Sequence, residues 1–255
     1  MIKVRAGGHE FLSELFVFDK DGLLFKSLNF WKGLAESRLK ALEALTFTDL
    51  IFDWAKLMGV ELGGSPGDIC VTRVNATGCL AIASISEEIS STTGYLALKA
   101  GLPWVEARET SREIISLADS FFDLEASLEP QKGFPEIFRR LREANIKYGI
   151  ATSDTKERAE RSIELYDDPS QLAFIVTPED VKYGKPNAEM ISYISKITGV
   201  QPRNITVVGD SYVDALMAKN AGAVGVGIPE DQIMAEQIER YTDIILSSLD
   251  EILLG

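Results

Sequence analysis

The stretch that decides how this chain folds is LFVFDKDGLLF, residues 15–25. Four apolar residues are followed at once by two carboxylates, Asp19 and Asp21, and by a glycine. Ionised carboxylates are costly to bury unless a cation or dense hydrogen bonding compensates for the lost water. The two acids at the end of this strand pattern are therefore either an exposed turn or part of a functional site, and the rest of the sequence has to decide.

Length and composition limit the number of domains, the partners and the location that can be expected of this protein. The 255 residues suffice for one large domain or two modest ones. The 26 basic and 39 acidic residues give a net charge of −13, which disfavours nucleic acid and anionic membranes as partners. No segment approaches the roughly 18 apolar residues of a membrane span, and Ser13 and Glu14 make the early apolar run a poor signal peptide. Two cysteines, Cys70 and Cys79, indicate reduced core thiols and a cytoplasmic protein.

A single histidine, His9, restricts the possible chemistry. It lies in Gly-Gly-His-Glu, which predicts a hairpin turn before the first long apolar run. Ser-His-Asp hydrolysis and histidine-rich zinc sites would both have to use this one residue. We therefore expect carboxylates to carry whatever chemistry the protein performs.

From residue 131 onward, short β-branched runs alternate with amphipathic helical patterns. The predicted strands cover 146–152, 172–177, 204–210, 223–228 and 242–247, and the predicted helices lie near 134–144, 155–166, 186–198, 212–221 and 231–240. This alternation predicts an α/β fold with a doubly wound, Rossmann-like parallel sheet covered by helices on both faces. Residues 15–19 add one strand, and IKVRA (2–6) opens a small hairpin. The predicted core domain comprises residues 1–24 and 131–255.

Residues 25–130 have a different pattern and predict an inserted, all-helical domain. Apolar residues recur at helical spacing from Leu28 to Leu45, and a second helix is expected over 48–58. Ser84 and Glu87 have the spacing of a capping box, and Pro103 can open a helix that runs to about 125. Trp31 and Trp104 are expected in the core of this domain. The one strand-like run is 69–74.

Ligands of parallel α/β sheets bind at the carboxyl ends of the strands. The polar residues at those ends, together with one lysine in Gly-Lys-Pro, are Asp19, Asp21, Thr152, Ser153, Lys185, Asp210 and Asp214. Each alone has an ordinary explanation as a turn acid, a helix cap or a solvated lysine. Together, at one edge of one sheet, they suit a magnesium ion and a phosphoryl group.

Four segments, LFVFDKDGLL, GIATSD, YGKPNAEM and VVGDSYVDALMAKNAGA, resemble in order the four motifs of the haloacid dehalogenase-like hydrolase superfamily. The resemblance covers the whole chain, because the helical insert lies where that family carries its cap, and it is closest to the phosphoglycolate phosphatase-like branch. One departure is Leu23, where many members have threonine. The resemblance implies a phosphatase acting on a small phosphorylated metabolite, with Mg²⁺ as cofactor.

The resemblance also implies a role for each motif residue. Asp19 would be the nucleophile that becomes an aspartyl phosphate, and Asp21 the acid and base for the leaving group and water. Thr152, Ser153 and Lys185 would bind the phosphoryl group. Mg²⁺ would be held by Asp19, Asp210 and the backbone carbonyl of Asp21, with Asp214 close by. A carboxylate needs such cations before it can attack a dianionic phosphate.

Three alternatives remain open. A dehalogenase on the same fold lacks the second acid, so Asp21 argues against it. A phosphosugar mutase shares all four motifs, but relatives of that type tend to carry a histidine early in the cap. A non-catalytic receiver module also surrounds an aspartyl phosphate with acids, Thr and Lys, but it is far shorter and has no helical insert.

The cap offers one candidate for substrate selection. Arg73 lies in the glycine-rich stretch 63–78, GGSPGDICVTRVNATG, which predicts a loop. Such a loop could present Arg73 to a second anionic group of the substrate. The ordinary alternative is a surface arginine. Neither the metabolite nor the oligomeric state follows from the sequence.

Overall fold

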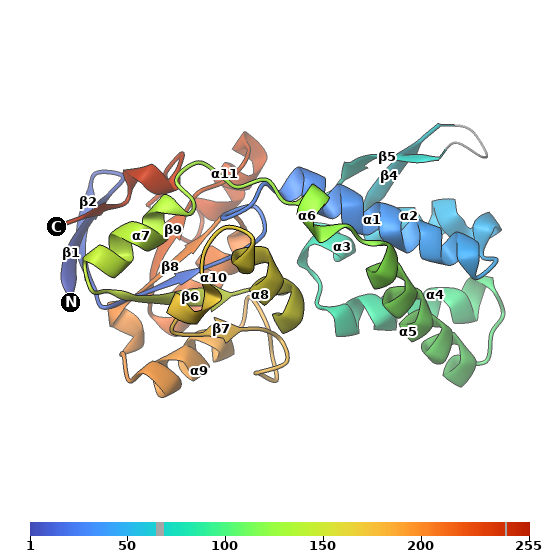
Figure 1. Ribbon diagram of the computed structural model, residues 1–255. Helices are drawn as coiled ribbons and strands as arrows, with labels where there is room; N and C mark the ends of the chain where they lie inside the picture. The colour runs from blue at the N-terminus through green and yellow to red at the C-terminus, as the bar shows by residue number, and fades with distance from the viewer. Residues whose placement is uncertain (65–68, 243) are drawn as a thin grey trace. The chain divides into compact units, whose positions relative to one another are not determined.

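A computed structural model describes residues 1–64, 69–242 and 244–255. The chain divides into two compact units (Figure 1). The first, here called the sheet unit, comprises Met1–Ser27 and Glu129–Gly255. The second, the inserted unit, comprises Leu28–Leu128. The chain thus leaves the sheet unit and returns to it once.

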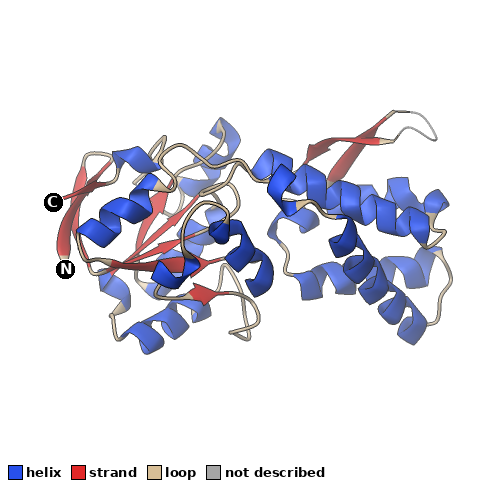
Figure 2. Ribbon diagram, viewed as in Figure 1, coloured by secondary structure: helices blue, strands red, loops and turns tan. Residues whose placement is uncertain are grey.

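The sheet unit is built on a five-stranded parallel sheet with the strand order β7-β6-β3-β8-β9 (Figure 2). Its strands are β3 (Leu15–Phe18), β6 (Lys147–Ala151), β7 (Ile175–Val176), β8 (Ile205–Gly209) and β9 (Val224–Gly227). The first strand of the chain order, β3, lies in the middle of the sheet. The predicted α/β class with a parallel sheet is confirmed.

Alternate residues of β3 face opposite sides of the sheet, as the pleat requires. Leu15 and Val17 pack in a core with Met190, Ile194 and Met217 and other apolar residues of the C-terminal half of the chain. On the other face, Phe18 lies 5.3 Å from Phe138 between ring centroids. Burial on both faces explains why LFVF is apolar throughout.

The helices of the sheet unit follow the predicted pattern; α10 has the predicted bounds and the other four are shorter. They are α7 (Glu136–Glu143), α8 (Lys156–Glu164), α9 (Glu189–Thr198), α10 (Tyr212–Ala221) and α11 (Gln232–Ile238), with 3₁₀ turns at Pro169–Gln171, Pro202–Asn204 and Leu249–Glu251. The strand expected at 242–247 is reduced to an isolated bridge between Ile245 and Gly227. Asp243, part of that expectation, lies outside the described residues.

A second, antiparallel sheet has the order β10-β1-β2. Its strands are β1 (Ile2–Ala6), β2 (His9–Ser13) and β10 (Leu253–Leu254). The hairpin predicted from IKVRA is present, with Gly7 and Gly8 at positive φ in the turn. His9 is the first residue of β2 and pairs with Ala6, so it follows the turn. The contribution of the last residues to this sheet was not predicted.

The inserted unit is mainly helical. Its helices are α1 (Ser27–Ala44, whose first residue belongs to the sheet unit), α2 (Ile51–Met58, preceded by a 3₁₀ turn at Thr48–Leu50), α3 (Cys79–Ile82), α4 (Ile85–Lys99), α5 (Trp104–Phe121) and α6 (Leu124–Ser127). The capping box is formed, since the Ser84 hydroxyl accepts from Glu87 N and the Glu87 carboxylate accepts from Ser84 N. The helix predicted to reach about 125 ends at Phe121, and Asp123 caps α6.

The expectation of an all-helical insert is wrong in one place. Strands β4 (Val60–Gly63) and β5 (Cys70–Val74) form an antiparallel hairpin. The β-branched residues of β5 favour a strand, and its partner VELG was too short to be recognised alone. Residues 65–68 of the predicted 63–78 loop lie outside the described residues. Cys70, on this hairpin, is an exposed thiol and not the core residue expected.

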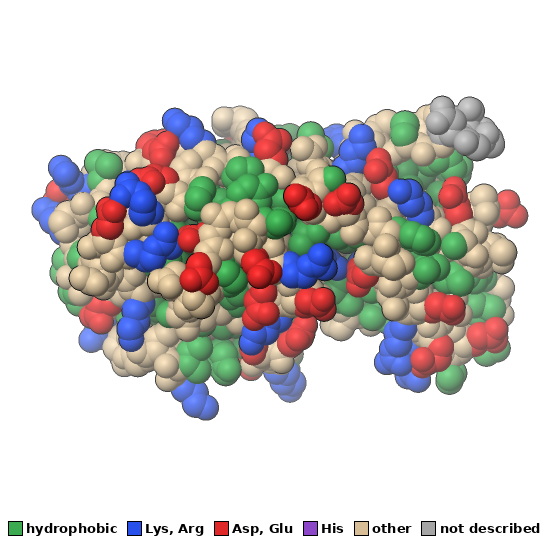
Figure 3. Space-filling view, in the orientation of Figure 1, with side chains coloured by type: hydrophobic (Ala, Val, Ile, Leu, Met, Phe, Trp, Pro, Cys, Tyr) green, Lys and Arg blue, Asp and Glu red, His purple; other side chains and the backbone are tan. Residues whose placement is uncertain are grey.

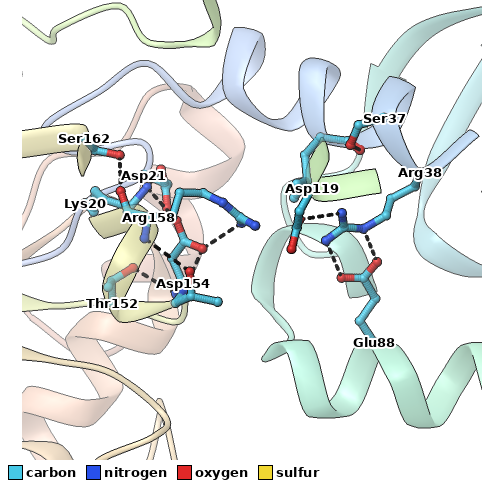
Figure 4. A network of polar contacts seen from close by, with 12 residues as sticks. Lys20, Asp21, Ser37, Arg38, Glu88, Asp119, Thr152, Asp154, Arg158 and Ser162 are labelled. Atoms are coloured by element: carbon cyan, nitrogen blue, oxygen red, sulfur yellow. Dashed lines mark hydrogen bonds and ion pairs between the residues drawn. The ribbon is translucent and has the colours of Figure 1, made fainter. Parts of the chain in front are cut away.

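A charge network is buried within the inserted unit. Arg38 is fully buried and donates from Nε to Glu88 Oε1 at 2.8 Å and from Nη1 to Asp119 Oδ1 at 3.0 Å (Figure 4). Nearby, Trp54 is fully buried and its indole N–H donates to Thr92 Oγ1 at 3.2 Å. Trp31 is partly buried and packs edge-on against Phe30, whereas Trp104 is 59% exposed, contrary to the expectation that it would be core.

Charged side chains are scattered among neutral and apolar ones on the face shown in Figure 3. On the face shown in Figure 3, acidic and basic side chains are interspersed, so the net charge of −13 is not gathered there into one patch. Among the described residues, no helix combines the length and the apolar composition that crossing a membrane requires.

Candidate active site

The polar residues predicted at the carboxyl edge of the sheet are brought together there. Asp19 follows β3, and its backbone N–H donates to Val208 O at 2.9 Å, which fixes it beside β8. Lys185 arrives from the loop before α9, and its ammonium lies 2.6 Å from Asp19 Oδ1 and 2.6 Å from Asp214 Oδ1. Three segments far apart in sequence thus meet around one lysine.

Asp19, Asp210 and Asp214 form a compact cluster of carboxylates. One oxygen of each lies within 4.8 Å of the others. Asp210 follows β8 and is 4% exposed, and Asp214 lies in the first turn of α10 and is 2% exposed. Three hard oxygen ligands at this spacing suit Mg²⁺, which prefers carboxylates.

Electrostatics support that fit. Burial raises the pKa of Asp210 well above its ordinary value, and the charges of Asp19, Asp214 and Glu230 raise it further. Burial also raises the pKa of Asp19, although Lys185 opposes the shift. Burial by itself would lower the pKa of Lys185, but Asp19 and Asp214 raise it overall, so the lysine stays charged. The cluster therefore holds more negative charge than one lysine neutralises, and a divalent cation would relieve the excess.

Two glycines allow the acids to sit this close to the backbone. A Cβ added to Gly22 would lie 2.0 Å from Asp210 Oδ2, and this glycine also has φ +91°. A Cβ added to Gly209 would lie 2.3 Å from Asp214 Cβ. Glycine is thus required at position 22 for two reasons: its backbone is left-handed, and the carboxylate of Asp210 leaves no room for a side chain.

Asp21 points to a different partner. It is 8% exposed, and its Oδ1 accepts from the ammonium of Lys20 at 2.5 Å (Figure 4). Burial, together with the charges of Asp154 and Asp19, raises the pKa of Asp21 to about 7, with Lys20 opposing the shift. The carboxylate of Asp21 is not a member of the Asp19 cluster within the described residues. The two acids of the opening motif therefore occupy separate environments.

The hydroxyl residues lie at the end of β6. Thr152 is 1% exposed, its N–H donates to Val176 O at 3.1 Å, and its Oγ1 accepts from Asp154 N at 3.1 Å. Because the hydroxyl accepts in this contact, its own hydrogen stays available to donate. Ser153 is the next residue and is partly exposed.

Arg73 lies in the inserted unit, away from these segments in sequence. It belongs to strand β5, its side chain is 65% exposed, and its Nη1 lies 3.6 Å from Glu61 Oε1 on the paired strand. It is therefore held on a hairpin and not in the loop that the glycine-rich stretch predicted.

Sequence reasoning missed three residues of this site. Lys20 and Asp154 form a buried ion pair, with 3.1 Å between Nζ and Oδ2. Glu230, after β9, accepts from Gln131 Nε2 at 2.7 Å and contributes negative charge near Asp210. The available signal was a lysine between two acids and an acid two residues after Thr152, but nothing in the pattern showed that Lys20 would turn inward.

Comparison with known proteins identifies the family. The model of the haloacid dehalogenase-like hydrolases matches residues 14–222. The chain belongs to this family. The matched range runs from the residue before β3 to the residue after α10, so it includes all four site segments and the inserted unit.

Two curated relatives are a phosphatase and a pyrophosphatase. The chain is 26% identical to validoxylamine A 7'-phosphate phosphatase of Streptomyces hygroscopicus subsp. limoneus, over 78% of this chain and 85% of that one. It is 30% identical to pyrophosphatase PpaX of Halalkalibacterium halodurans over 49% of this chain and 59% of the relative. The matches to such pyrophosphatases span between 55% and 59% of their length.

Among solved structures, β-phosphoglucomutase of Clostridium difficile superposes with a TM-score of 0.61 at 16% identity, covering 94% of this chain and 93% of that one. At this identity the likeness concerns the fold alone. It confirms the Rossmann-like α/β unit with an inserted helical unit, and it leaves the reaction to be argued from the site.

Proposed function

We propose that this protein is a magnesium-dependent phosphatase that hydrolyses a small phosphorylated metabolite through a phosphoryl group carried on Asp19. The observation that supports this best is the pairing of the Asp19 carboxylate with Lys185 beside two further buried acids. In this proposal a carboxylate nucleophile, a fixed cation and a set of hard oxygens share one edge of the sheet.

Asp19, Asp210 and Asp214, with the backbone carbonyl of Asp21, would hold the Mg²⁺ ion. When bound, the ion would neutralise negative charge at the site and so let an anionic substrate approach a carboxylate. Lys185 would offset the same negative charge whether or not the ion is bound, since its ammonium already contacts Asp19. Thr152, through its hydroxyl hydrogen, and Ser153 would donate to the phosphoryl oxygens.

The chemistry of the chain's own residues then has two halves. An oxygen of Asp19 attacks phosphorus, the bond from phosphorus to the ester oxygen breaks, and Asp21 gives its proton to the departing oxygen. Asp21 then takes a proton from water, the water oxygen attacks phosphorus, and the bond to Asp19 breaks to release inorganic phosphate. Asp21 suits both halves because a pKa of about 7 lets it give and take a proton near neutrality.

Substrate choice is assigned to the inserted unit, Leu28–Leu128, acting as the cap domain. Arg73 is the candidate there for a second anionic group of the substrate. Its ion pair with Glu61 is exposed and therefore weak enough to exchange for a substrate anion.

Phosphate release tests the proposal. The purified protein is assayed with 4-nitrophenyl phosphate and a panel of phosphorylated metabolites, with Mg²⁺ or with a chelator. We expect inorganic phosphate to appear only with Mg²⁺ and to disappear in Asp19→Asn. The control is Glu10→Gln, which removes an exposed ion pair with Lys3 in the same unit. Isomerised sugar phosphate without phosphate release would indicate a mutase, and activity retained in the chelator would contradict the proposal.

A further inference from the structure

Lys20 is an unusual residue for its position. It stands between the two acids of the opening motif, and its side chain is fully buried. Its ammonium lies 2.5 Å from Asp21 Oδ1 and 3.1 Å from Asp154 Oδ2, so it bridges the end of β3 to the segment after β6 (Figure 4). A buried lysine needs such partners, because an unpaired ammonium in the interior is costly.

Asp154 is itself held on several sides. Its Oδ1 accepts from Arg158 Nη1 at 2.8 Å and from Thr155 N at 2.8 Å. Its backbone N–H donates to the hydroxyl of Thr152 at 3.1 Å. The carboxylate that anchors Lys20 is therefore fixed by the loop that also carries the expected phosphate-binding hydroxyl.

Each of the two buried lysines of the site contacts one of the two acids of the opening motif. Lys185 contacts Asp19 and Asp214, and Lys20 contacts Asp21 and Asp154. Stability alone does not explain the second arrangement, since well-packed apolar residues often serve as well as buried ion pairs. What Lys20 does is hold one oxygen of Asp21 in place.

We propose that Lys20, anchored by Asp154, is a positioning residue that holds the Asp21 carboxyl group by Oδ1 so that its other oxygen faces the leaving group and the attacking water. The inference rests on the proposed function and deepens it. Proton transfer requires the acid to lie within hydrogen-bond reach of the proton's destination, so loss of this anchor reduces the protonation of the leaving group more than it reduces attack by Asp19.

A double-mutant cycle tests the proposal. Lys20→Met, Asp21→Asn and the double variant are compared on an alkyl phosphate, whose leaving group needs a proton, and on 4-nitrophenyl phosphate, whose leaving group scarcely does. We expect Lys20→Met to lower kcat on the alkyl phosphate about 10²-fold and on the aryl phosphate far less, at the lower end of what acid–base catalysis contributes. In the Asp21→Asn background, Lys20→Met should not change the ratio of the two rates.

Trapping of the intermediate provides a second readout. Because Asp21 also activates water, Lys20→Met mixed with acetyl phosphate and Mg²⁺ should accumulate phosphorylated protein, which the unmodified protein hydrolyses. Lys3→Met, which removes an exposed lysine paired with Glu10, serves as the control and should behave as the unmodified protein. A purely structural role for Lys20 would lower both rates alike and trap nothing.

Asp154→Asn keeps the test decisive if Lys20→Met does not fold. This variant preserves the shape of the side chain and leaves Lys20 paired with Asp21. We therefore expect the same selective loss of kcat on the alkyl phosphate, but only several-fold and thus smaller than in Lys20→Met. This loss should appear only when Asp21 is present. Equal losses on both substrates, or losses that multiply with Asp21→Asn, would overturn the proposal while leaving the phosphatase assignment intact. An unmodified protein without phosphate release would instead overturn the proposed function and this inference with it.

Discussion

Both units of this protein bury charged side chains, but they balance the charges differently. In the inserted unit, Arg38 meets a buried carboxylate, Glu88, and a half-exposed one, Asp119, with hydrogen bonds to both. At the edge of the sheet, the Asp19 cluster holds three carboxylates, and Lys185 contacts two of them, Asp19 and Asp214. The first cluster is satisfied by the chain itself, and the second is not.

The difference shows how a functional cluster can be told from a structural one. A buried network whose charges and hydrogen bonds are matched within the chain needs no ligand. A buried cluster with excess negative charge, whose members have raised pKa values, is stable only if protons or a cation neutralise it. The two clusters should therefore respond in opposite ways to mutation, pH and metal.

The largest expected effect is on catalysis at the unbalanced cluster. Asp19→Asn should lower phosphate release by at least about 10⁴-fold, because removal of the proposed covalent nucleophile would remove the main reaction path. The thermal midpoint should not fall, since the variant removes one of several like charges. Steady-state assays and thermal unfolding of the same preparation check both statements, and a variant that loses both activity and stability would erase the distinction between the clusters.

The balanced cluster should show the opposite pattern. Arg38→Met should lower the free energy of unfolding by about 3–5 kcal/mol, because Glu88 is left buried without its cation. Lys99→Met, at an exposed pair with Asp53, is the matched control and should lower the free energy of unfolding far less. Chemical denaturation measures both. Stability unchanged in Arg38→Met would mean that the network is not structural.

The dependence of stability on pH sharpens the comparison further. The pKa of Asp21 is raised from 3.8 to about 7, so between these pH values the folded protein retains a proton that the unfolded chain has released. Stability in a chelator should therefore fall as pH rises across this window, and the raised pKa values of Asp19 and Asp210 act in the same direction. Saturating Mg²⁺ should flatten the curve. Thermal midpoints measured between about pH 5 and pH 8, with and without Mg²⁺, test this prediction. A midpoint that rises with pH in the chelator would refute it.

The smallest expected effect lies on the hairpin of the inserted unit. If Arg73 meets a second anion of the substrate, Arg73→Ala should raise KM for the best metabolite about fivefold, since an exposed or partly exposed charge contact contributes about 1 kcal/mol. The same variant should leave 4-nitrophenyl phosphate unaffected. Glu61→Gln, which removes the present partner of Arg73, should not raise KM. Equal changes of KM on both substrates would mean that Arg73 acts through the folding of the inserted unit and not through contact with the substrate.

The sequence predicts the edge of the sheet well for a physical reason. Carboxyl ends of parallel strands share one edge, so acids and hydroxyls placed just after apolar runs must come close whatever the loops do. Local rules also suffice for the capping box at Ser84 and Glu87. The proximity of Asp19 and Asp210 follows from this rule, whereas Lys185 reaches the cluster from the loop before α9 and was expected there from the motif resemblance.

Other features depend on packing that no local pattern encodes. Lys20 lies between two acids in sequence, and only the surrounding fold turns its side chain inward to Asp154. The β4–β5 hairpin pairs a four-residue strand that has little signal of its own. Trp104 has the spacing of a core residue, yet it lies at the start of α5 and is 59% exposed, since periodicity does not show where a helix ceases to be covered.

The most direct test of the account is the site of phosphorylation. Asp21→Asn is mixed with acetyl phosphate and Mg²⁺, quenched in acid and digested, because this variant should form the intermediate and hydrolyse it slowly. The account predicts a mass increase of about 80 Da, one phosphoryl group, on the peptide that contains Asp19. Asp19→Asn treated in the same way should carry none. A label on any other residue, or turnover without any phosphorylated protein, would contradict the central claim that Asp19 is the nucleophile.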